Sequence, residues 1–439
     1  MHRQMHDRPP NLVDLEVPKL NSCSDLVVCR TLHAMSSQSS AHGERVEASD
    51  GGNLSEEPER AQAYVQRPLP TDLTLPTETH RALAMAEHTL GELNESTRRL
   101  PHGGMFALCT RLREVQNMAQ LAGTSLDLTE AWLIELLLAR ATGDSAEQVL
   151  RRHPIGRVIL AFAHGAARVE AGAVVDGELI GEIDERLTGT VTGSTESRLR
   201  TRQSWLSGRS TNQIPILTTP PGAMLHGAFA LWSTWAPAPH PLPRIGKISL
   251  GHLNLKLMDP FENNGVYLSC IYTSLEMVCS RLLRGQVLSL ASWLDENAGE
   301  YHDRISAVVD GAPIEQWIDF FARGVQAQAA AQLRLIQELD RLRESMLKRV
   351  GGSSTMRSVV AGLMTAPVTS NRALEAMYGI ADRTATQITR KLEDHEVVEN
   401  VGRRTYNKVF VCQPVLDLYA LQTPLASESD RAVFSPPAN

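Results

Sequence analysis

One long helical pattern, from Pro313 to Val350, decides the class of fold that this chain can adopt. The stretch PIEQWIDFFARGVQAQAAAQLRLIQELDRLRESMLKRV repeats apolar residues at the three- and four-residue spacing of a helix with one buried face. The pair Gly351-Gly352 and the two serines after it are typical of a helix end and a hinge. The pattern therefore predicts a helical bundle that is completed by this helix, and a separate small domain beyond it.

Shorter helical patterns precede the long one. Within residues 77–94, Leu83, Leu90 and Leu93 recur at helical spacing. Residues 190–221 are instead rich in Thr, Ser, Gly and Pro, which predicts loops with short strands. The predicted fold class is therefore mainly α. Further helices are predicted over 105–121, 126–142, 155–171, 177–186, 221–235, 245–257, 267–284 and 291–309.

The two ends of the chain differ in composition from the rest. The N-terminal region includes SSQSSAHGERVEASDGGNLSEEPER, which has almost no large apolar residues and cannot bury a core. We expect a mostly disordered tail with a short structured piece around 12–28; the alternative is a regulatory or partner-binding arm. The predicted organisation is a tail over 1–62, a helical domain over 63–350, a small domain over 355–420 and a polar tail over 421–439.

Composition excludes several classes of protein. The formal net charge of -7 gives no global basic field, so any binding of nucleic acid must use a local patch. No apolar run is long enough to predict a helix across a membrane, and the first residues do not resemble a secretory signal. The six cysteines form no CxxC pair, which favours reduced thiols over a metal or disulfide framework. These features together predict a cytoplasmic protein.

Several stretches resemble one known family in their order and spacing. The entry RPLPTDLTL is followed by the helix RALAMAEHTLGEL, then by RLRTRQSWLSG with TTPP, and then by EYHDRISAVVDGAPIEQWIDFFARGV. Over residues 67–350 this order resembles the Fic (filamentation, AMP-transferring) family. The resemblance implies a helical Fic-like domain that, in active members, transfers AMP from ATP with a bound Mg²⁺.

The defining motif of that family is His-Pro-Phe-x-Asp-Gly-Asn-Gly-Arg-x-x-Arg, and each part has a chemical reason. The His removes a proton from the target hydroxyl, for which an imidazole near neutral pKa is suited. The Gly-rich turn before a helix presents backbone N–H groups to phosphates. The acidic residue holds the metal, and the Arg residues neutralise phosphate charge.

The matching stretch of this chain, MDPFENNGVYLSC, has lost most of these groups. Asp259 stands where the family has His, and Asn263 replaces the acidic residue unless a one-residue slip brings Glu262 there. Asn264 and Gly265 keep part of the turn. The remaining correspondences are Pro260 and Phe261, which match, and Tyr267 and Cys270, which occupy the two Arg positions.

These replacements predict a catalytically degenerate site. An ionised Asp259 repels a triphosphate, and two lost charge-assisted contacts cost about 1.5–3 kcal/mol each. Loss of a general base removes about 10²–10⁴ in rate. We therefore predict no catalytic residue, metal or cofactor, and favour the interpretation that the motif only keeps a loop-to-helix turn. The alternatives are that Asn264 and Gly265 are the remnant of an ATP/Mg²⁺ site, or that Asp259 acts as a weak base.

Two further positions of the resemblance agree with that interpretation. Many family members carry an inhibitory Ser-x-x-x-Glu-Gly helix, and here Ala122 stands where its Glu would be. His252, on the helix before the motif, is two turns from Asp259 and is predicted to be structural.

The small C-terminal domain gives the clearest functional pattern. Ser370 is a plausible N-cap of one helix, Gly379 makes a sharp turn, and Asp382 is expected to cap a second helix. Ala385, Ile388 and Leu392 face inward on that second helix. Strand-like runs over 397–401 and 408–412 follow, joined by the basic segment GRRTYN.

This order resembles the winged helix appended to many Fic proteins, and it predicts DNA binding. Basic and polar residues gather on the outer face of the second helix and in the wing, as contact with phosphates requires. Because a winged helix usually recognises a half-site, we expect a homodimer. The predicted DNA-binding residues are Arg383, Thr384, Thr386, Gln387, Arg390, Lys391, Arg403, Arg404 and Lys408.

Three functions remain in view. The first is a transcriptional regulator that joins a degenerate Fic-like domain to a winged helix. The second is an active or residual protein AMP transferase with a non-standard motif. The third is a scaffold or antitoxin-like partner that binds another protein.

Overall fold

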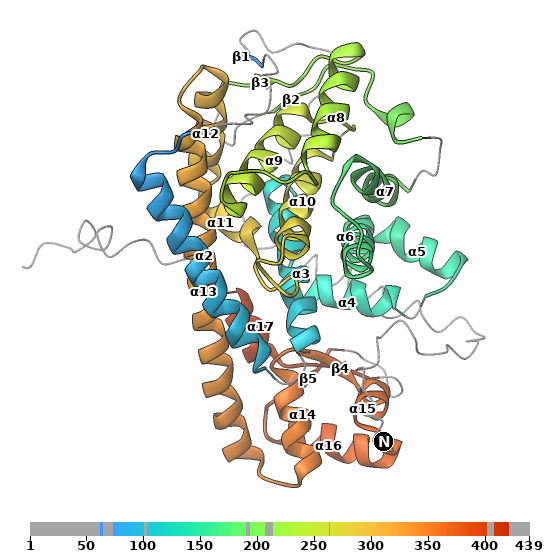
Figure 1. Ribbon diagram of the computed structural model, residues 1–439. Coiled ribbons are helices and arrows are strands. Elements are labelled where there is room, and N and C mark those ends of the chain that lie inside the picture. The colour runs from blue at the N-terminus through green and yellow to red at the C-terminus, as the bar shows by residue number, and fades with distance from the viewer. Residues whose placement is uncertain are drawn as a thin grey trace, which may run out of the picture.

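A computed structural model describes residues 62–64, 73–100, 103–139, 141–189, 194–206, 214–262, 264–401 and 408–420. These residues are mainly helical, as the sequence predicts, with two small three-stranded sheets (Figure 1). Most of the predicted N-terminal tail and all of the C-terminal tail lie outside the described residues, as do Asn263, Arg403 and Arg404.

The bundle is built around two pairs of helices. The long helix α13 (Ile314–Val350) packs along α2 (Thr77–Arg98) on one side of the molecule (Figure 1). At the centre α9 (Arg244–Met258) packs against α10 (Gly265–Cys279). The other bundle helices are α3 (Gly103–Leu121), α4 (Leu128–Leu138), α5 (Asp144–Arg152), α6 (Ile155–Glu170), α7 (Gly177–Thr188), α8 (Ala223–Trp235), α11 (Leu290–Glu296) and α12 (Ala298–Val309).

Helix α9 is buried on all sides, which places it in the middle of the core. Large aromatic side chains surround it and bind its backbone. The indole of Trp317 donates to the Ser249 carbonyl at 2.9 Å, and that of Trp232 donates to the Gly251 carbonyl at 3.2 Å. A Cβ atom on Gly251 would collide with the ring of Tyr272, so this glycine allows α10 to lie close to α9.

A small sheet lies beside the end of α9. Its strands are β1 (Gln62–Ala63), β2 (Trp205–Leu206) and β3 (Ile216–Leu217), in the order β1-β3-β2. β2 pairs antiparallel and β1 parallel with β3. The sequence predicts short strands in this region, and the structure confirms β2 and β3.

The C-terminal elements form three helices and an antiparallel sheet. Ser353 and Ser370 accept hydrogen bonds from Met356 N and Ala373 N and so cap the first two helices. Gly379 has φ 62°, the left-handed turn that the sequence predicts. The elements are α14 (Ser354–Leu363), β4 (Val368–Ser370), α15 (Asn371–Tyr378), α16 (Asp382–Asp394), β5 (Glu399–Asn400) and β6 (Val409–Val411), with strand order β4-β6-β5.

A last helix, α17 (Gln413–Ala420), returns to the bundle and contacts α13 and α4. Tyr419 is fully buried there, with its ring centroid 6.1 Å from that of Phe106 on α3. Its hydroxyl donates to the Met364 carbonyl at 3.2 Å, directly after α14. The buried core therefore runs without a break from the bundle into the C-terminal elements.

Several predicted helix boundaries are wrong, each for a local reason. The stretch 291–309 is two helices that meet at Asn297, rather than one. α10 ends at Cys279 instead of reaching 284, because Arg281 adopts a positive φ of 62°. Asp382 is the first residue of α16 and not its cap, which is Ala381. The short helices α5 and α17 were not predicted.

Among the described residues, none of the helices has the length and apolar character that crossing a membrane requires. The same residues contain no group of three or more His, Cys, Asp or Glu side chains that could hold a metal ion.

Candidate functional site

The first candidate site lies where α9 ends and α10 begins. Asp259 follows α9 with φ 43° and ψ 64°, a left-handed conformation that Asp tolerates better than most residues. Phe261 is buried beside it and packs edge-to-face on Phe229, with ring centroids 5.7 Å apart. The chain therefore reverses between the two central helices on a short turn whose apolar side chain fills the core.

Arg200 holds this turn in place, because its guanidinium binds two consecutive carbonyl oxygens where α9 ends. Nε donates to the Asp259 carbonyl at 2.7 Å and Nη2 donates to the Met258 carbonyl at 3.2 Å. Other hydrogen bonds from the same group reach the Arg202 carbonyl, the Thr218 hydroxyl and the Thr219 carbonyl. Arg200 is 3% exposed, so it ties the segment before β2 and the segment after β3 to the end of α9.

The Asp259 side chain points inward rather than to solvent. Its Oδ2 accepts a hydrogen bond from the Ser204 hydroxyl at 2.7 Å, and the residue is 8% exposed. Burial raises the pKa of the Asp259 carboxyl, while Ser204 and the nearby cations Lys256 and Arg200 partly oppose the rise. The Asp259 carboxyl thus already interacts with other groups of the chain, a hydroxyl and two nearby cations.

The same carboxyl lies against the first residue of α10. A Cβ atom on Gly265 would collide with Oδ1 of Asp259, so only a glycine leaves room for the oxygen. The first turn of a helix has N–H groups without helical partners and attracts negative charge. The position where a bound anion would meet the start of α10 is therefore taken by a carboxylate of the chain itself.

Asn264 and the residues around it form a second part of the site. The Asn264 amide donates to Oδ1 of Asp184 on α7 at 2.7 Å. Asp184 in turn lies 3.7 Å from Nη1 of Arg198, whose guanidinium also sits 5.7 Å from the ring of Phe261. Burial raises the pKa of Asp184, and Asn264 and Arg198 partly oppose the rise.

The site does not fit the Mg²⁺–triphosphate that the resemblance implies. At the two Arg positions of the motif stand Tyr267, which is half-buried, and Cys270, which is buried among apolar residues. The acidic side chain of Glu262 is bound instead to Arg202 at 2.9 Å. No described residue at the turn offers a free acid for a metal, and the Asp259 carboxyl lies against the first residue of α10.

His252 does not serve as a base in place of Asp259. It is fully buried, with Nδ1 3.0 Å from the Ser269 carbonyl and Nε2 2.8 Å from the Tyr301 hydroxyl. Burial lowers the pKa of its imidazole to about 3, so the ring stays neutral. Its partners make it a structural residue, as the sequence predicts. Ala122, at the position of the inhibitory Glu, is exposed after α3.

The structure thus brings Asp259, Asn264 and Gly265 together, and it adds residues that the sequence did not single out. Arg200, Ser204, Asp184 and Arg198 complete the site from two distant segments. Arg200 and Ser204 belong to RLRTRQSWLSG, a stretch matched only for its order in the chain.

The second candidate site is the outer face of α16. Arg383, Thr384, Thr386, Gln387 and Arg390 are exposed, while Ala385, Ile388 and Leu392 are buried as predicted. A helix advances about 100° per residue, so Arg383, Gln387 and Arg390 point in nearly the same direction.

Three of the predicted DNA-binding residues of this domain differ from the others. Lys391 is half-buried, and its Nζ lies near Gly352 in the linker before α14, so it leaves the outer face. Thr386 accepts a hydrogen bond from the Asn371 amide at 2.9 Å, which fixes α16 to the start of α15. Lys408 is half-buried before β6. Residues 402–407, the basic segment predicted to join β5 and β6, lie outside the described residues.

The structure draws attention to one basic residue that the sequence prediction missed. Arg372 is exposed in the first turn of α15, next to the Asn371–Thr386 contact. Neither Arg372, Arg383 nor Arg390 forms an ion pair within the described part of the chain. Their positive charges therefore remain available at the surface.

No family model matches the sequence, and no curated protein matches it. Among solved structures, the chain is similar to a Fic family protein from Desulfovibrio desulfuricans G20, with 14% sequence identity and a TM-score of 0.46. The match covers 79% of this chain and 98% of that chain.

Proposed function

We propose that the chain is a DNA-binding transcriptional regulator, in which a catalytically degenerate Fic-like bundle carries a C-terminal winged helix. The observation that carries the proposal is the exposed face of Arg383, Gln387 and Arg390 on α16, whose opposite side is buried. In a winged helix the helix at this place in the order enters the major groove, where Arg and Gln recognise guanine and adenine.

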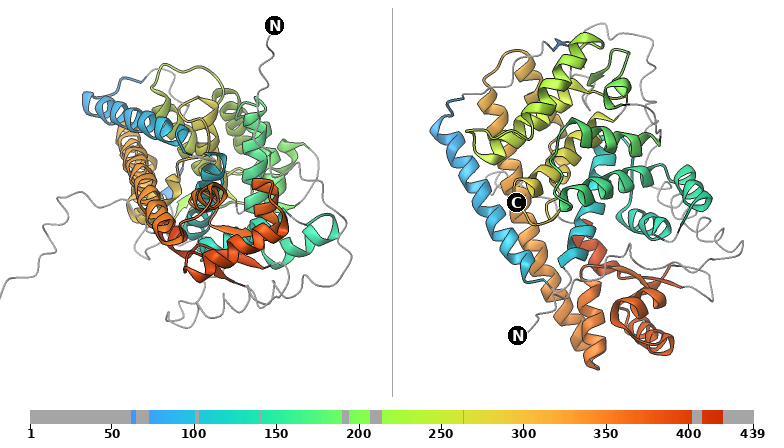
Figure 2. Two further views of the ribbon diagram at one scale, coloured as in Figure 1. Left: turned by 90° about the horizontal axis from the view of Figure 1, so that it is seen from below. Right: turned by 45° about the vertical axis from the view of Figure 1, so that its right-hand side comes forward.

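The arrangement around α16 supports this proposal. Helices α15 and α16 contact each other and are joined by the turn at Gly379. Strands β5 and β6 follow as an antiparallel pair next to β4, which is the order of a winged helix-turn-helix. In the view from below, α15 and α16 lie at the front of the molecule (Figure 2, left).

The first site supports a loss of transfer chemistry. A general base must reach the target hydroxyl, but the Asp259 carboxyl is buried, bound to Ser204 and packed on Gly265. In this proposal the turn keeps the bundle folded, and the protein acts as a homodimer whose two α16 helices occupy successive half-sites.

The test is capture of genomic DNA fragments by the full-length protein, followed by sequencing and by binding measurements on an enriched fragment. We expect Arg383→Ala with Arg390→Ala to weaken binding at least about 30-fold, because each base contact contributes about 1–3 kcal/mol. The matched control is Arg81→Ala with Arg334→Ala, two exposed arginines on α2 and α13. Equal losses in both double variants, or no enrichment of any sequence, would refute the proposal.

A second measurement separates the regulator from the two alternatives. Purified protein is incubated with labelled ATP, Mg²⁺ and candidate protein targets. Label transfer that disappears in Asp259→Ala would make the chain an AMP transferase. Stable binding of a protein partner without any DNA enrichment would support the alternative that the chain is a scaffold or antitoxin-like partner.

A further inference from the structure

We infer that the helical bundle supplies a second phosphate-contacting surface, the α5 surface, formed by Gln148, Arg151 and Arg152 of α5. The inference rests on the DNA-binding function proposed above. It extends that function because these contacts come from the bundle and not from the C-terminal elements.

The cations of the α5 surface are exposed and have no acidic partner. Gln148, Arg151 and Arg152 are all exposed, whereas Leu150 anchors the opposite side of α5 in the core. The ion pair of this helix uses Glu147, whose carboxylate lies 3.2 Å from Arg157 of α6. Within the described part of the chain, Arg151 and Arg152 form no ion pair, so their charge is free to meet a ligand.

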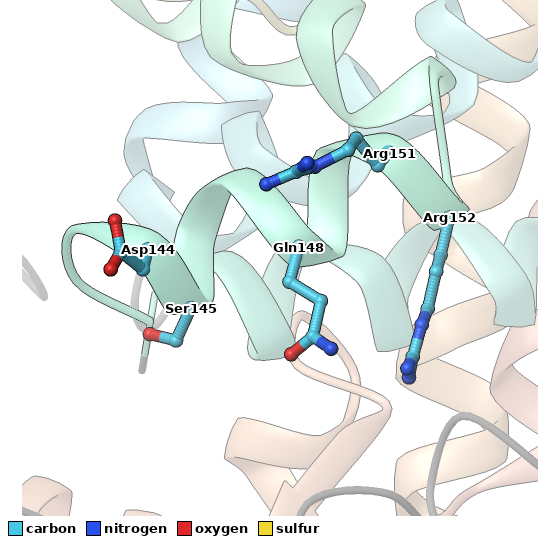
Figure 3. A pocket seen from close by; sticks show the side chains of 5 residues that line it. All are labelled: Asp144, Ser145, Gln148, Arg151 and Arg152. Atoms are coloured by element: carbon cyan, nitrogen blue, oxygen red, sulfur yellow. The ribbon is translucent and has the colours of Figure 1, made fainter.

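The surface is hollowed at the same place. An open pocket of about 620 Å³ is lined by Asp144, Ser145, Gln148, Arg151 and Arg152. Figure 3 shows Gln148 and Arg152 extending to the same side of α5. A guanidinium group binds phosphate oxygens through two parallel N–H groups, and an amide adds a further donor. Asp144 lies at the opposite end of α5, so the part of the lining that carries Arg151 and Arg152 suits a phosphate of a polymer backbone.

The elements between α5 and α16 form an unbroken series of contacts. α5 packs on α4, α4 contacts β4, β4 contacts α15, and α15 contacts α16. α15 carries the exposed Arg372 near its start. Figures 1 and 2 place α5 and α15 on the same side of the molecule, away from α2 and α13. Basic residues thus follow one side of the protein from the bundle to the predicted reading helix.

A DNA duplex is the partner that this distribution favours. It carries one negative charge per about 1.7 Å of its axis, so a surface beside the reading helix meets phosphates whatever the sequence. Contacts of this kind position a protein on the duplex without contributing base specificity.

Arg151 and Arg152 also lie in the last turn of α5, where a cation stabilises a helix by about 0.3–1 kcal/mol. That role concerns the folding of α5 and predicts no change in how DNA binding depends on salt. The free energy of unfolding and the salt dependence of binding are therefore measured on the same variants.

The experiment uses the full chain, a labelled duplex of random sequence and a duplex containing an enriched genomic site. Affinities are measured over a range of salt concentrations for the wild type, for Arg151→Gln with Arg152→Gln, and for Arg81→Gln with Arg334→Gln. The control pair removes the same charge from α2 and α13.

The slope of log K against log salt is negative, and the loss of two phosphate contacts should reduce its magnitude by about 1.8. We expect the Arg151→Gln/Arg152→Gln protein to show this change on both duplexes, with an affinity loss on the order of 10–100-fold at 0.1 M salt. The control pair should keep the wild-type slope. An unchanged slope in the α5 variant, or an equal change in the control, overturns the inference.

The outcomes also separate this inference from the proposed function. Suppose that Arg383→Ala/Arg390→Ala abolishes site-specific binding while the α5 variant binds like the wild type. The proposed DNA-binding function is then supported, and the inference that the α5 surface contacts phosphates is refuted. If the wild type binds neither duplex, both are wrong.

Discussion

The carboxylate of Asp259 lies so close to Gly265 that a Cβ atom on this glycine would collide with Oδ1. The two residues flank the turn between α9 and α10, and the helix that begins at Gly265 receives the negative charge at its N-terminal end. Asp259 is also bound by Ser204, and its backbone carbonyl is bound by Arg200. A position that in the resembled family carries the reacting group is here part of the structural core.

Gly265→Ala should therefore destabilise the protein. The added methyl group displaces Asp259 from its hydrogen bond with Ser204, and overpacking of this kind typically costs about 1–3 kcal/mol. Urea denaturation followed by circular dichroism measures the change. Asp259→Ala should remove most of the extra cost of the alanine at 265, as a double-mutant cycle would show.

Gly91→Ala is the control for that substitution. Gly91 is exposed within α2, and a Cβ atom there would meet nothing within 4 Å. An alanine in an exposed helix should stabilise the protein by about 0.5–1 kcal/mol. If both glycine variants change stability in the same direction, the contact between Gly265 and Asp259 is not what makes Gly265 necessary.

Arg200→Lys should destabilise the protein by about 1–3 kcal/mol for each buried carbonyl left unpaired, because a lysine cannot reproduce the planar set of donors. Its near neighbour Arg202 provides the comparison. That side chain is 59% exposed and pairs with Glu262 at the surface, so Arg202→Lys should change stability by less than about 1 kcal/mol. Similar losses in the two variants would contradict the role given to Arg200.

Glu114 gives a prediction of pH dependence. Its carboxyl accepts hydrogen bonds from the Ser289 hydroxyl at 2.8 Å and from Ala291 N at the start of α11. Burial raises the pKa of Glu114 from 4.5 to about 7, and the hydrogen bonds and Arg113 partly oppose the rise. Between these values the folded state binds more protons than the unfolded state, so this group contributes stability at low pH that is lost as pH rises toward 7.

Glu114→Gln should remove that dependence. The variant should match the wild type near pH 4.5 and exceed it at pH 8 by up to roughly 3 kcal/mol, at about 1.4 kcal/mol per pKa unit. Parallel stability curves for the two proteins across this range, measured by urea denaturation, would show that Glu114 does not titrate as described.

Gly379→Ala should destabilise the C-terminal elements by about 1 kcal/mol, because φ 62° is costly for any residue with a Cβ atom. Gly379→Asn should cost less, since Asn tolerates this conformation. Proteolysis of the region after α14 reports the change locally. If the two variants are equally protected, the turn between α15 and α16 does not depend on its left-handed conformation.

Most of the fold could be predicted from the sequence, because long amphipathic patterns such as that of α13 carry a strong helical signal. The break at Asn297 was missed, although the polar run of Asp295, Glu296 and Asn297 interrupts the apolar pattern there. Helix α5 was missed because it has only 9 residues, with Leu150 as its one buried side chain, and so short a segment does not show a clear apolar repeat.

The sequence indicated those residues of the candidate sites that lie close together in the chain. Asp259, Asn264 and Gly265 share one turn, and the exposed face of α16 follows from its period. Arg200 and Asp184 reach the turn from distant segments, and a pattern of residue types does not indicate such long-range hydrogen bonds. The sequence also could not indicate that Nζ of Lys391 lies near Gly352, so the DNA contact predicted for Lys391 stays a prediction.

The burial of Tyr419 between Phe106 and Met364 limits how the C-terminal elements can be transferred to another protein. The last described helix, α17, is also part of the bundle core, so the C-terminal elements that include α16 are not an independent unit that can be moved to another protein. A graft of residues 354–420 onto another scaffold would have to carry matching surfaces of α3, α4 and α13 with it. Exchange of residues 354–420 with the matching part of another protein is therefore expected to be tolerated only where α3, α4 and α13 are exchanged with them.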